Sequence, residues 1–164
     1  MSMLHMKPAR MNTFAAALAA SLLSTPAVAQ DNALTVALGY NSNGSTEGYL
    51  GWRGVPLRFG FQPVVGASLS TRSEGWVGAG LAYTWRASSN PGFVRVAVMP
   101  GLYRQGSGRN LGGAVMFRSS LEVGMALRGG GELLLGAAHR SNAGIYRHNP
   151  GMNTVYLGYS IALN

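Results

Sequence analysis

The sequence predicts an all-β chain that folds as an eight-stranded antiparallel transmembrane β-barrel. Eight segments alternate apolar residues with small or polar ones, which is the period of a strand whose two faces meet different surroundings. Charged residues make up 11% of the chain, whereas soluble domains usually carry roughly 25%. Glycine occurs 24 times, which disfavours long helices and suits tightly curved strands.

The N-terminal segment has the pattern of a secretory signal peptide. Lys7 and Arg10 precede an apolar stretch at 14–23, and a small-x-small pattern ends at Ala29. The apolar stretch is too short to span a bilayer as a helix. We therefore expect residues 1–29 to be cleaved and residues 30–164 to form the barrel domain.

The strands follow in order along the remaining chain, separated by Gly, Asn, Ser and Pro. They are predicted at residues 33–42, 46–54, 57–70, 75–86, 92–103, 113–127, 131–141 and 153–163. The first shows the alternation clearly, because Leu34, Val36 and Leu38 share one face and Thr35 and Ala37 share the other. The alternation continues in later strands with the apolar residues Leu57, Phe59 and Phe61; Val77, Leu81 and Tyr83; Val94, Val96 and Val98; Val115, Phe117 and Leu121; Leu133 and Leu135; and Val155, Leu157 and Tyr159.

A soluble β-sandwich would give the same period with its apolar faces turned inward. However, the opposite faces carry glycine, alanine, serine and isolated charges rather than the dense charge of a solvated surface. A small barrel with lipid outside and a tight polar interior explains this composition. Arg118, Glu122, Glu132 and Arg140 have inward parity, and we expect them to pair inside the barrel.

Charge and composition limit the partners. After removal of the signal peptide the chain keeps eleven basic residues, all arginine, against five acidic ones. Arginine binds phosphate in a two-pronged way, so a phosphate-bearing partner fits this excess. Positive charge that lines a barrel interior and its loops fits it equally well. Nucleic acid is disfavoured by the export signal and by the scattering of the arginines over many strands. With no cysteine, and only His139 and His148 beyond the signal peptide, no metal site is expected and no cofactor is required.

The seventh strand ends in a polar pair. His139 and Ser141 share the parity of Leu133 and Leu135, so they should continue the outer face of the barrel at its rim. If the last two strands form a hairpin whose loop centres near residue 146, His139 faces Asn153 across the strands. Ser141, His139 and Asn153 would then form a nucleophile, a base and an orienting group.

Topology places this predicted site in the outer leaflet. With both ends of an eight-stranded barrel on the periplasmic side of an outer membrane, the last hairpin turns on the extracellular side. The ester-bearing lipid of that leaflet is lipopolysaccharide. Its phosphates could be met by rim arginines such as Arg147.

The segments His139-Arg140-Ser141-Asn142-Ala143-Gly144 and Asn149-Pro150-Gly151 resemble the outer-membrane lipid A 3-O-deacylase (PagL) family. The likeness in layout covers most of the predicted mature chain. It implies an eight-stranded barrel that removes the ester-linked hydroxyacyl chain at position 3 of lipid A. The family uses a serine, a histidine and a glutamate on the outer barrel face.

The resemblance also implies roles for single residues. His139 and Ser141 match the base and the nucleophile. Asn142 and Asn149 match motif asparagines, and Phe117 matches an aromatic position on the neighbouring strand that could contact acyl chains. An oxyanion hole is expected from backbone N–H groups between Asn142 and Gly144, with the Asn142 side chain as a further donor.

One position departs from the family pattern. Asn153 stands where the family has its orienting glutamate, and Glu122 and Glu132 have inward parity and cannot easily replace it. An asparagine can hold one tautomer of a histidine but cannot stabilise imidazolium with charge. The sequence therefore leaves open a slower site or a catalytically weakened relative.

The function predicted from the sequence is an outer-membrane serine esterase acting on lipid A in a Gram-negative bacterium. The alternative is a non-enzymatic small outer-membrane barrel with a structural or adhesive role. A third hypothesis is that the chain is a secreted soluble β-sandwich. The sequence does not decide the acyl-chain preference or whether the barrel forms a homodimer.

Overall fold

The computed structural model describes residues 32–86, 90–128 and 131–163, so the predicted signal peptide lies outside the described residues. Eight strands close into a barrel in sequence order, with β8 returning to β1. They are β1 (Ala33–Asn41), β2 (Thr46–Arg53), β3 (Phe61–Ser70), β4 (Gly75–Arg86), β5 (Gly92–Arg104), β6 (Val115–Ala126), β7 (Gly131–Ser141) and β8 (Met152–Ala162). The predicted fold class is therefore confirmed.

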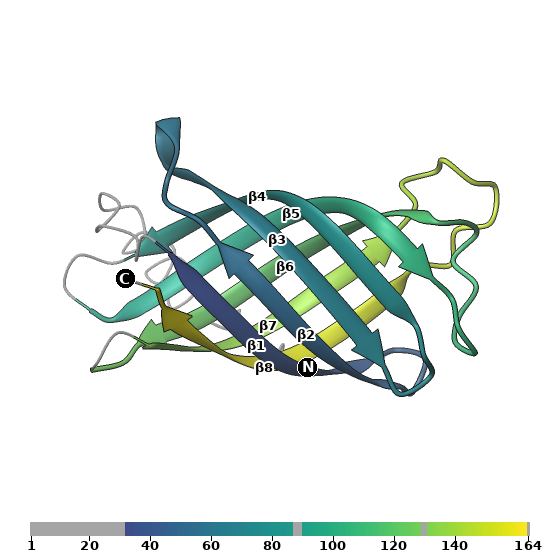
Figure 1. Cartoon of the computed structure of the whole chain (residues 1–164), viewed down its shortest axis with the longest axis horizontal. Helices are drawn as coiled ribbons and strands as arrows, with labels where there is room; N and C mark the ends of the chain where they lie inside the picture. The colour runs from purple at the N-terminus through teal and green to yellow at the C-terminus, as the bar shows by residue number, and fades with distance from the viewer. Residues whose placement is uncertain (1–31, 87–89, 129–130, 164) are drawn as a thin grey trace, which may run out of the picture.

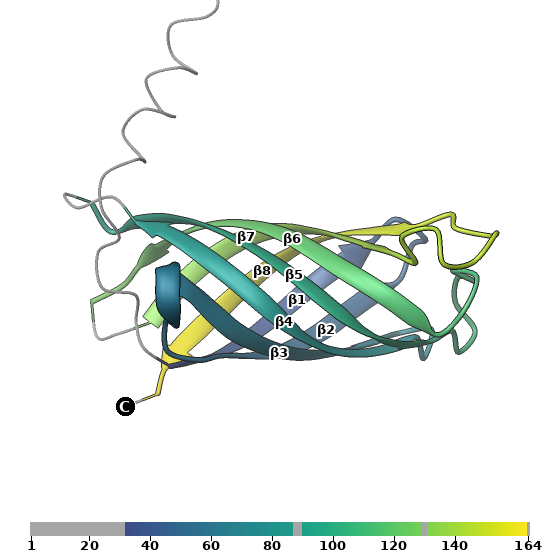
Figure 2. The ribbon, with the colours of Figure 1, turned by 90° about the horizontal axis from the view of Figure 1, so that it is seen from above.

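All neighbouring strands pair antiparallel, so loops alternate between the two ends of the barrel. The longer loops at 105–114 and 142–151 extend from one end, which we call the long-loop end (Figure 1). The last strand, β8, ends at the other end, the short-loop end. Figure 2 shows the same strongly tilted strands from above, as barrel closure requires.

The two faces of the barrel differ as the alternation predicts. Outward side chains are apolar and open, for example Leu38 at 65%, Leu157 at 58% and Leu135 at 53% exposure. Inward positions hold the buried polar and charged residues. This inverted arrangement, with leucine outside and arginine inside, is that of a barrel surrounded by lipid. No helix in the described part of the chain is long and apolar enough to cross a membrane.

The short-loop half of the interior is organised around one buried glutamate. Glu132 is fully buried and accepts hydrogen bonds from Arg53 at 3.1 Å, from Arg95 at 2.7 Å and from Arg86. Arg95 also donates to Glu122 at 2.9 Å. Because buried carboxylates are stable only when paired, these contacts hold five strands of the barrel together through its lumen.

The long-loop half holds a second ion pair. Arg140 donates to Glu47 at 3.1 Å, and its guanidinium lies 5.5 Å from the ring of Trp76. Arg118 instead lies between the rings of Tyr49 and Tyr156, at 4.7 and 5.2 Å. All four residues point inward as expected, and the expected pairing inside the barrel is confirmed for Glu122, Glu132 and Arg140, while Arg118 lies between two tyrosine rings.

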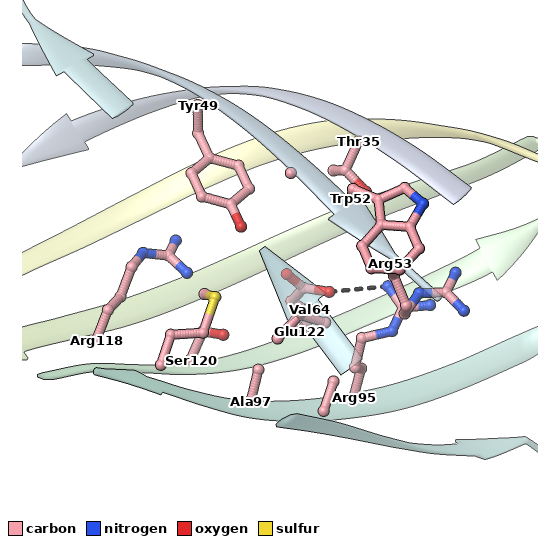
Figure 3. Close-up of a pocket in the computed structure, with 13 residues that line it drawn as sticks. Thr35, Tyr49, Trp52, Arg53, Val64, Arg95, Ala97, Arg118, Ser120 and Glu122 are labelled. Carbon is pink, nitrogen blue, oxygen red and sulfur yellow. Dashed lines mark hydrogen bonds and ion pairs between the residues drawn. The ribbon is translucent and has the colours of Figure 1, made fainter. Parts of the chain in front are cut away.

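Little space remains inside the barrel. A cavity of about 30 Å³ lies between the two groups of charges (Figure 3), which is room for only one or two water molecules. In Figure 3 Glu122 is joined to Arg95 on one side of the cavity, while Tyr49 and Arg118 close the other. The lumen is a packed polar core and not a channel.

The largest boundary difference lies before β3. The sequence predicts a strand from residue 57, but Arg58–Gly60 form a 3-10 turn and β3 begins at Phe61. Phe59 has φ 64° and Gly60 has φ 81°, which is the left-handed region rather than an extended strand. The alternation of Leu57, Phe59 and Phe61 here reflects a turn with apolar side chains.

A hydrogen-bonded carboxylate ties the loops of the long-loop end together. Glu74 accepts bonds from the Arg109 backbone N–H at 2.8 Å, from Ser70 at 2.7 Å, from Ser45 at 3.0 Å and from Tyr103 at 3.2 Å. Burial alone would raise the pKa of Glu74, but these donors outweigh it and hold the pKa below its usual value. The carboxylate therefore stays ionised and fixes the 105–114 loop to β3 and β4.

Candidate active site on the outer face

The candidate site is built on the hairpin of β7 and β8. His139 pairs directly with Asn153 in the observed register, and the predicted register is thereby confirmed. The His139 Nδ1 and the Asn153 Oδ1 lie 2.7 Å apart. Both residues are exposed on the outer surface, in line with Leu135 and Leu157. An Asn oxygen in this place accepts a hydrogen bond from Nδ1–H, which leaves Nε2 as the free base.

The free edge of the imidazole faces the long-loop end. A β-carbon placed on Gly151 would lie 2.8 Å from His139 Cε1 and 3.3 Å from Nε2. Extending the β7–β8 register by one residue pair places Gly151 opposite Ser141. Nε2 is therefore directed toward the level of Ser141, one pleat beyond His139 on the same face. Neither Ser141 Oγ nor His139 Nε2 has a hydrogen-bond partner within the described chain.

Gly151 and Arg109 together keep the free edge of the His139 imidazole open. Gly151 has φ 62°, a conformation that glycine adopts without steric penalty. Its carbonyl accepts a hydrogen bond from Arg109 Nη1 at 3.1 Å, so the 105–114 loop also supports this position. The Gly151 signal was available in the sequence, because the same register argument that pairs 139 with 153 pairs 141 with 151.

The loop after Ser141 is held by its own amides. The Asn142 side chain is fully buried, and its nitrogen donates to the carbonyls of Leu111 and His148 at 2.9 and 2.8 Å. Its oxygen accepts the Gly144 N–H at 2.9 Å, and its own N–H donates to Asn149 Oδ1 at 3.1 Å. Asn142 and Asn149 are therefore loop-positioning residues here.

These hydrogen bonds limit which N–H groups remain free to stabilise an oxyanion. The Asn142 side chain, expected as a donor, is used within the loop, and so is the Gly144 N–H. Ala143 has φ 52° and lies exposed between them, and its N–H has no partner within the described chain. Backbone N–H donors were predicted at residues 142–144, and of these only the Ala143 N–H is free to bind an oxyanion.

A shallow groove leads from the imidazole along the barrel wall. Its lining includes Ser119 on β6, which pairs directly with His139 from the other side. Ala137 lies between Leu121 and Val155 in the next row. Because Ala137 is smaller than either neighbour, the surface is hollowed there. Sequence reasoning missed Ser119, whose parity places it on the same outer face.

The remaining predicted residues lie at the edge of this arrangement. Phe117 pairs with Ser141 across β6 and β7 and is half-buried. Arg147 is exposed in the 142–151 loop, at the long-loop end.

No acid among the described residues completes the site. All four glutamates of the described chain are buried or engaged in the lumen and in the long-loop network, as given above. No group of three His, Cys, Asp or Glu side chains within the described ranges could hold a metal ion. The arrangement is thus an imidazole, a neutral orienting amide, two nearby hydroxyls and one free backbone donor.

Comparison with known proteins gives one family. A family model described as lipid A 3-O-deacylase (PagL) matches residues 32–162. No curated protein matches the chain. Among solved structures, the outer-membrane enzyme PagL superposes with a TM-score of 0.69 at 17% identity, covering 80% of this chain and 99% of that one.

Two further barrels share the fold. A de novo designed transmembrane β-barrel gives a TM-score of 0.61 at 11% identity, covering 85% of this chain and 98% of the design. Neisserial surface protein A gives 0.55 at 11% identity, covering 80% and 94%. At these identities the structural likeness concerns the fold alone.

Proposed function

Since the chain belongs to the lipid A 3-O-deacylase (PagL) family, we propose that it removes the ester-linked 3-hydroxyacyl chain from position 3 of lipid A by serine esterase chemistry. Family membership and the barrel fold indicate an outer-membrane protein of a Gram-negative bacterium. The long-loop end is then extracellular, because longer loops face outward in such barrels. The site opens into the outer leaflet.

The observation that carries the proposal is the state of His139. Its Nδ1 is bonded to Asn153 at 2.7 Å, its Nε2 is free, and Nε2 is directed toward the level of Ser141. A polar group on the lipid-facing wall is expensive without a purpose. The three side chains supply a base in a fixed tautomer beside a hydroxyl, which is what acyl transfer needs.

The reaction follows in two halves. Ser141 Oγ attacks the acyl carbonyl carbon while its proton passes to His139 Nε2, and the carbonyl oxygen takes the negative charge. The Ala143 N–H donates to that oxyanion. The tetrahedral intermediate then collapses, and His139 returns the proton to the sugar oxygen that leaves. A water, activated by the same imidazole, releases the hydroxy acid from Ser141.

Ser141 is favoured over Ser119 as the nucleophile on two grounds. Nε2 faces the long-loop side, where Ser141 lies, and the free Ala143 N–H follows Ser141 by two residues. Ser119 pairs with His139 at its own level on β6. Phe117 and the groove beside Ala137 would contact acyl chains, and Arg147 would meet lipid A phosphate.

The test is mass spectrometry of lipid A from cells that express the chain, its Ser141→Ala variant and its Ser107→Ala variant. Ser107 is a matched control, because its hydroxyl bonds to Arg72 O in another extracellular loop. We expect wild type and Ser107→Ala to remove one hydroxyacyl group and Ser141→Ala to remove none. Loss that persists after Ser141→Ala would refute the assignment.

A non-enzymatic barrel remains the second candidate, and the observation that favours it is that no carboxylate of the described part of the chain lies beside His139. In that case lipid A from cells expressing wild type, Ser141→Ala and His139→Ala would be identical. Mass spectrometry of lipid A from cells that express these variants therefore distinguishes the esterase from the non-enzymatic barrel.

A further inference from the structure

The loop between β2 and β3 carries a surface that the proposed chemistry does not use. Residues 54–60 lie at the short-loop end, far along the barrel from His139. Val55, Leu57 and Phe59 are exposed by 46%, 54% and 76%. We call residues 55–59 the apolar finger. We propose that the apolar finger inserts sideways into the headgroup region of the periplasmic leaflet and binds glycerophospholipid.

The shape of the finger is fixed by its own bonds. Leu57 N–H donates to Phe61 O at 2.6 Å, and Gly60 N–H donates to Leu57 O at 3.2 Å, which closes the turn. Phe59 holds φ 64° at the tip, in the left-handed region that is strained for a residue with a side chain. The strained turn holds the Phe59 ring out from the barrel, where it is the most exposed large apolar side chain of those described.

The direction of the finger matches a membrane interface. Figure 1 shows the turn standing off the barrel wall, at the level where neighbouring strands end, rather than continuing along the barrel axis. In Figure 2, which views the barrel from above, the turn is seen end-on in front of the same end of the barrel. Since the strands cross the membrane, a sideways projection at their ends lies in the plane of the headgroups.

The base of the finger is continuous with the lipid-facing aromatic residues. A β-carbon on Gly60 would lie 3.2 Å from the Tyr83 ring. Tyr83 in turn contacts Phe61, with ring centroids 5.4 Å apart, and Trp85, at 4.7 Å. Aromatic side chains of this kind collect where a barrel meets the headgroups. The finger therefore extends a surface that already faces lipid.

Arg58, the single charged residue of the apolar finger, also fits a phospholipid partner. The Arg58 guanidinium lies 5.0 Å from the Phe59 ring, and the described residues offer it no carboxylate. Arginine over an aromatic ring keeps its donors free for a phosphate. An exposed ring beside one guanidinium suits a phospholipid, whose acyl region and phosphate lie side by side. In water the same apolar residues would form an association-prone patch.

The absence of cysteine from the chain makes a site-specific probe possible. Leu57→Cys carries an environment-sensitive fluorophore while Arg58 and Phe59 remain in place. Gln105→Cys, in an exposed extracellular loop, is the matched control. Both labelled barrels are reconstituted in phosphatidylethanolamine and phosphatidylglycerol vesicles, and folding is checked by the heat-dependent mobility of the barrel in gels.

We expect lipids with a nitroxide near the headgroup to quench the label at 57 at least twofold more than lipids with a nitroxide at the chain end. Aqueous iodide should quench the label at 105 at least twofold more than the label at 57. In a Phe59→Ser background, iodide quenching at 57 should rise. Equal iodide quenching at 57 and 105 would overturn the proposal, because the finger would lie in water.

Two other results would also overturn it. A label at 57 that neither quencher reaches would mean that protein covers the finger, as a second copy of the chain would. An unchanged signal in the Phe59→Ser background would mean that Phe59 does not anchor the loop. None of these results depends on whether the chain hydrolyses lipid A.

Discussion

Replacing Asn153 by aspartate tests the unusual feature of the site with the smallest change of shape. The carboxylate oxygen would occupy the place of Asn153 Oδ1, 2.7 Å from His139 Nδ1. An amide can present oxygen or nitrogen to the ring, whereas a carboxylate can only accept. Asn153→Asp would therefore keep the tautomer that the Asn153 oxygen already favours, with Nε2 free, and would in addition stabilise the imidazolium that forms when Ser141 is deprotonated.

The size of the effect follows from the geometry. Opposite charges about 4 Å apart attract by about 1 kcal/mol in water and about 4 kcal/mol near a protein surface. His139 and Asn153 lie on the lipid-facing wall near the extracellular rim, between lipid and water, so we expect a value within this range, about 1–3 kcal/mol. This corresponds to an increase in kcat of about 5- to 150-fold.

The assay is release of hydroxy acid from purified lipid A in mixed detergent micelles at saturating substrate. Asn110→Asp is the matched control, since Asn110 Oδ1 also accepts an N–H, from Gly112 at 2.8 Å, and the change adds the same charge at the extracellular end. We expect Asn110→Asp to leave kcat within twofold. An Asn153→Asp variant that is no faster than wild type would refute the idea that imidazolium forms beside residue 153 in the transition state.

Three further predictions concern positions around the site and the interior. Gly151→Ala should lower kcat at least about tenfold, since the new β-carbon would press on the His139 ring. Gly44→Ala is the control: Gly44 has φ 83° and its β-carbon would make only ordinary contacts, so this variant carries the same backbone strain and should change kcat less than twofold. Glu132→Gln should lower the free energy of unfolding in urea by about 3–5 kcal/mol, because three buried arginines lose their carboxylate. An unchanged urea midpoint of unfolding would contradict the stabilising role given to these ion pairs. The lowered pKa of Glu74 means that its contribution to stability is present above about pH 4.5, its ordinary pKa, and is lost as the pH falls through the lower folded value. Hydrogen-exchange protection in the 105–114 loop, measured against the intrinsic exchange rate at each pH, should therefore fall only in acid, and Glu74→Gln should abolish this acid-dependent loss.

Alternation and parity were enough to predict the strands and the pairing of the last hairpin. Period-2 alternation fixes which face each side chain takes, so His139, Ser141 and Asn153 could be placed on one face without a structure. The hairpin register followed from where the loop centres. These are local properties of the chain, and local properties are what a sequence pattern reports.

The interior pairs could not be predicted in the same way. Arg53 and Glu132 lie 79 residues apart and meet only because the barrel closes. Which charges face each other across the lumen depends on strand stagger around the whole barrel, and no local pattern encodes it. Parity correctly turned Glu132 and Arg140 inward but gave no information about their partners.

The loop geometry was hidden for a different reason. Leu57, Phe59 and Phe61 alternate as a strand would, and only the left-handed backbone at Phe59 and Gly60 shows that they form a turn. Asn142 has the composition of an oxyanion donor, but its side chain is used by the carbonyls of Leu111 and His148. Each case depends on backbone conformation that several residues set together.

The most direct test of the account is to locate the acyl-enzyme bond. The detergent-solubilised barrel is treated with a long-chain alkyl phosphonate that reacts with activated serine, and the modified peptide is sequenced by tandem mass spectrometry. The account predicts one adduct on Ser141 that is absent from the His139→Ala variant. An adduct on Ser119, or modification of Ser141 that does not depend on His139, would contradict it.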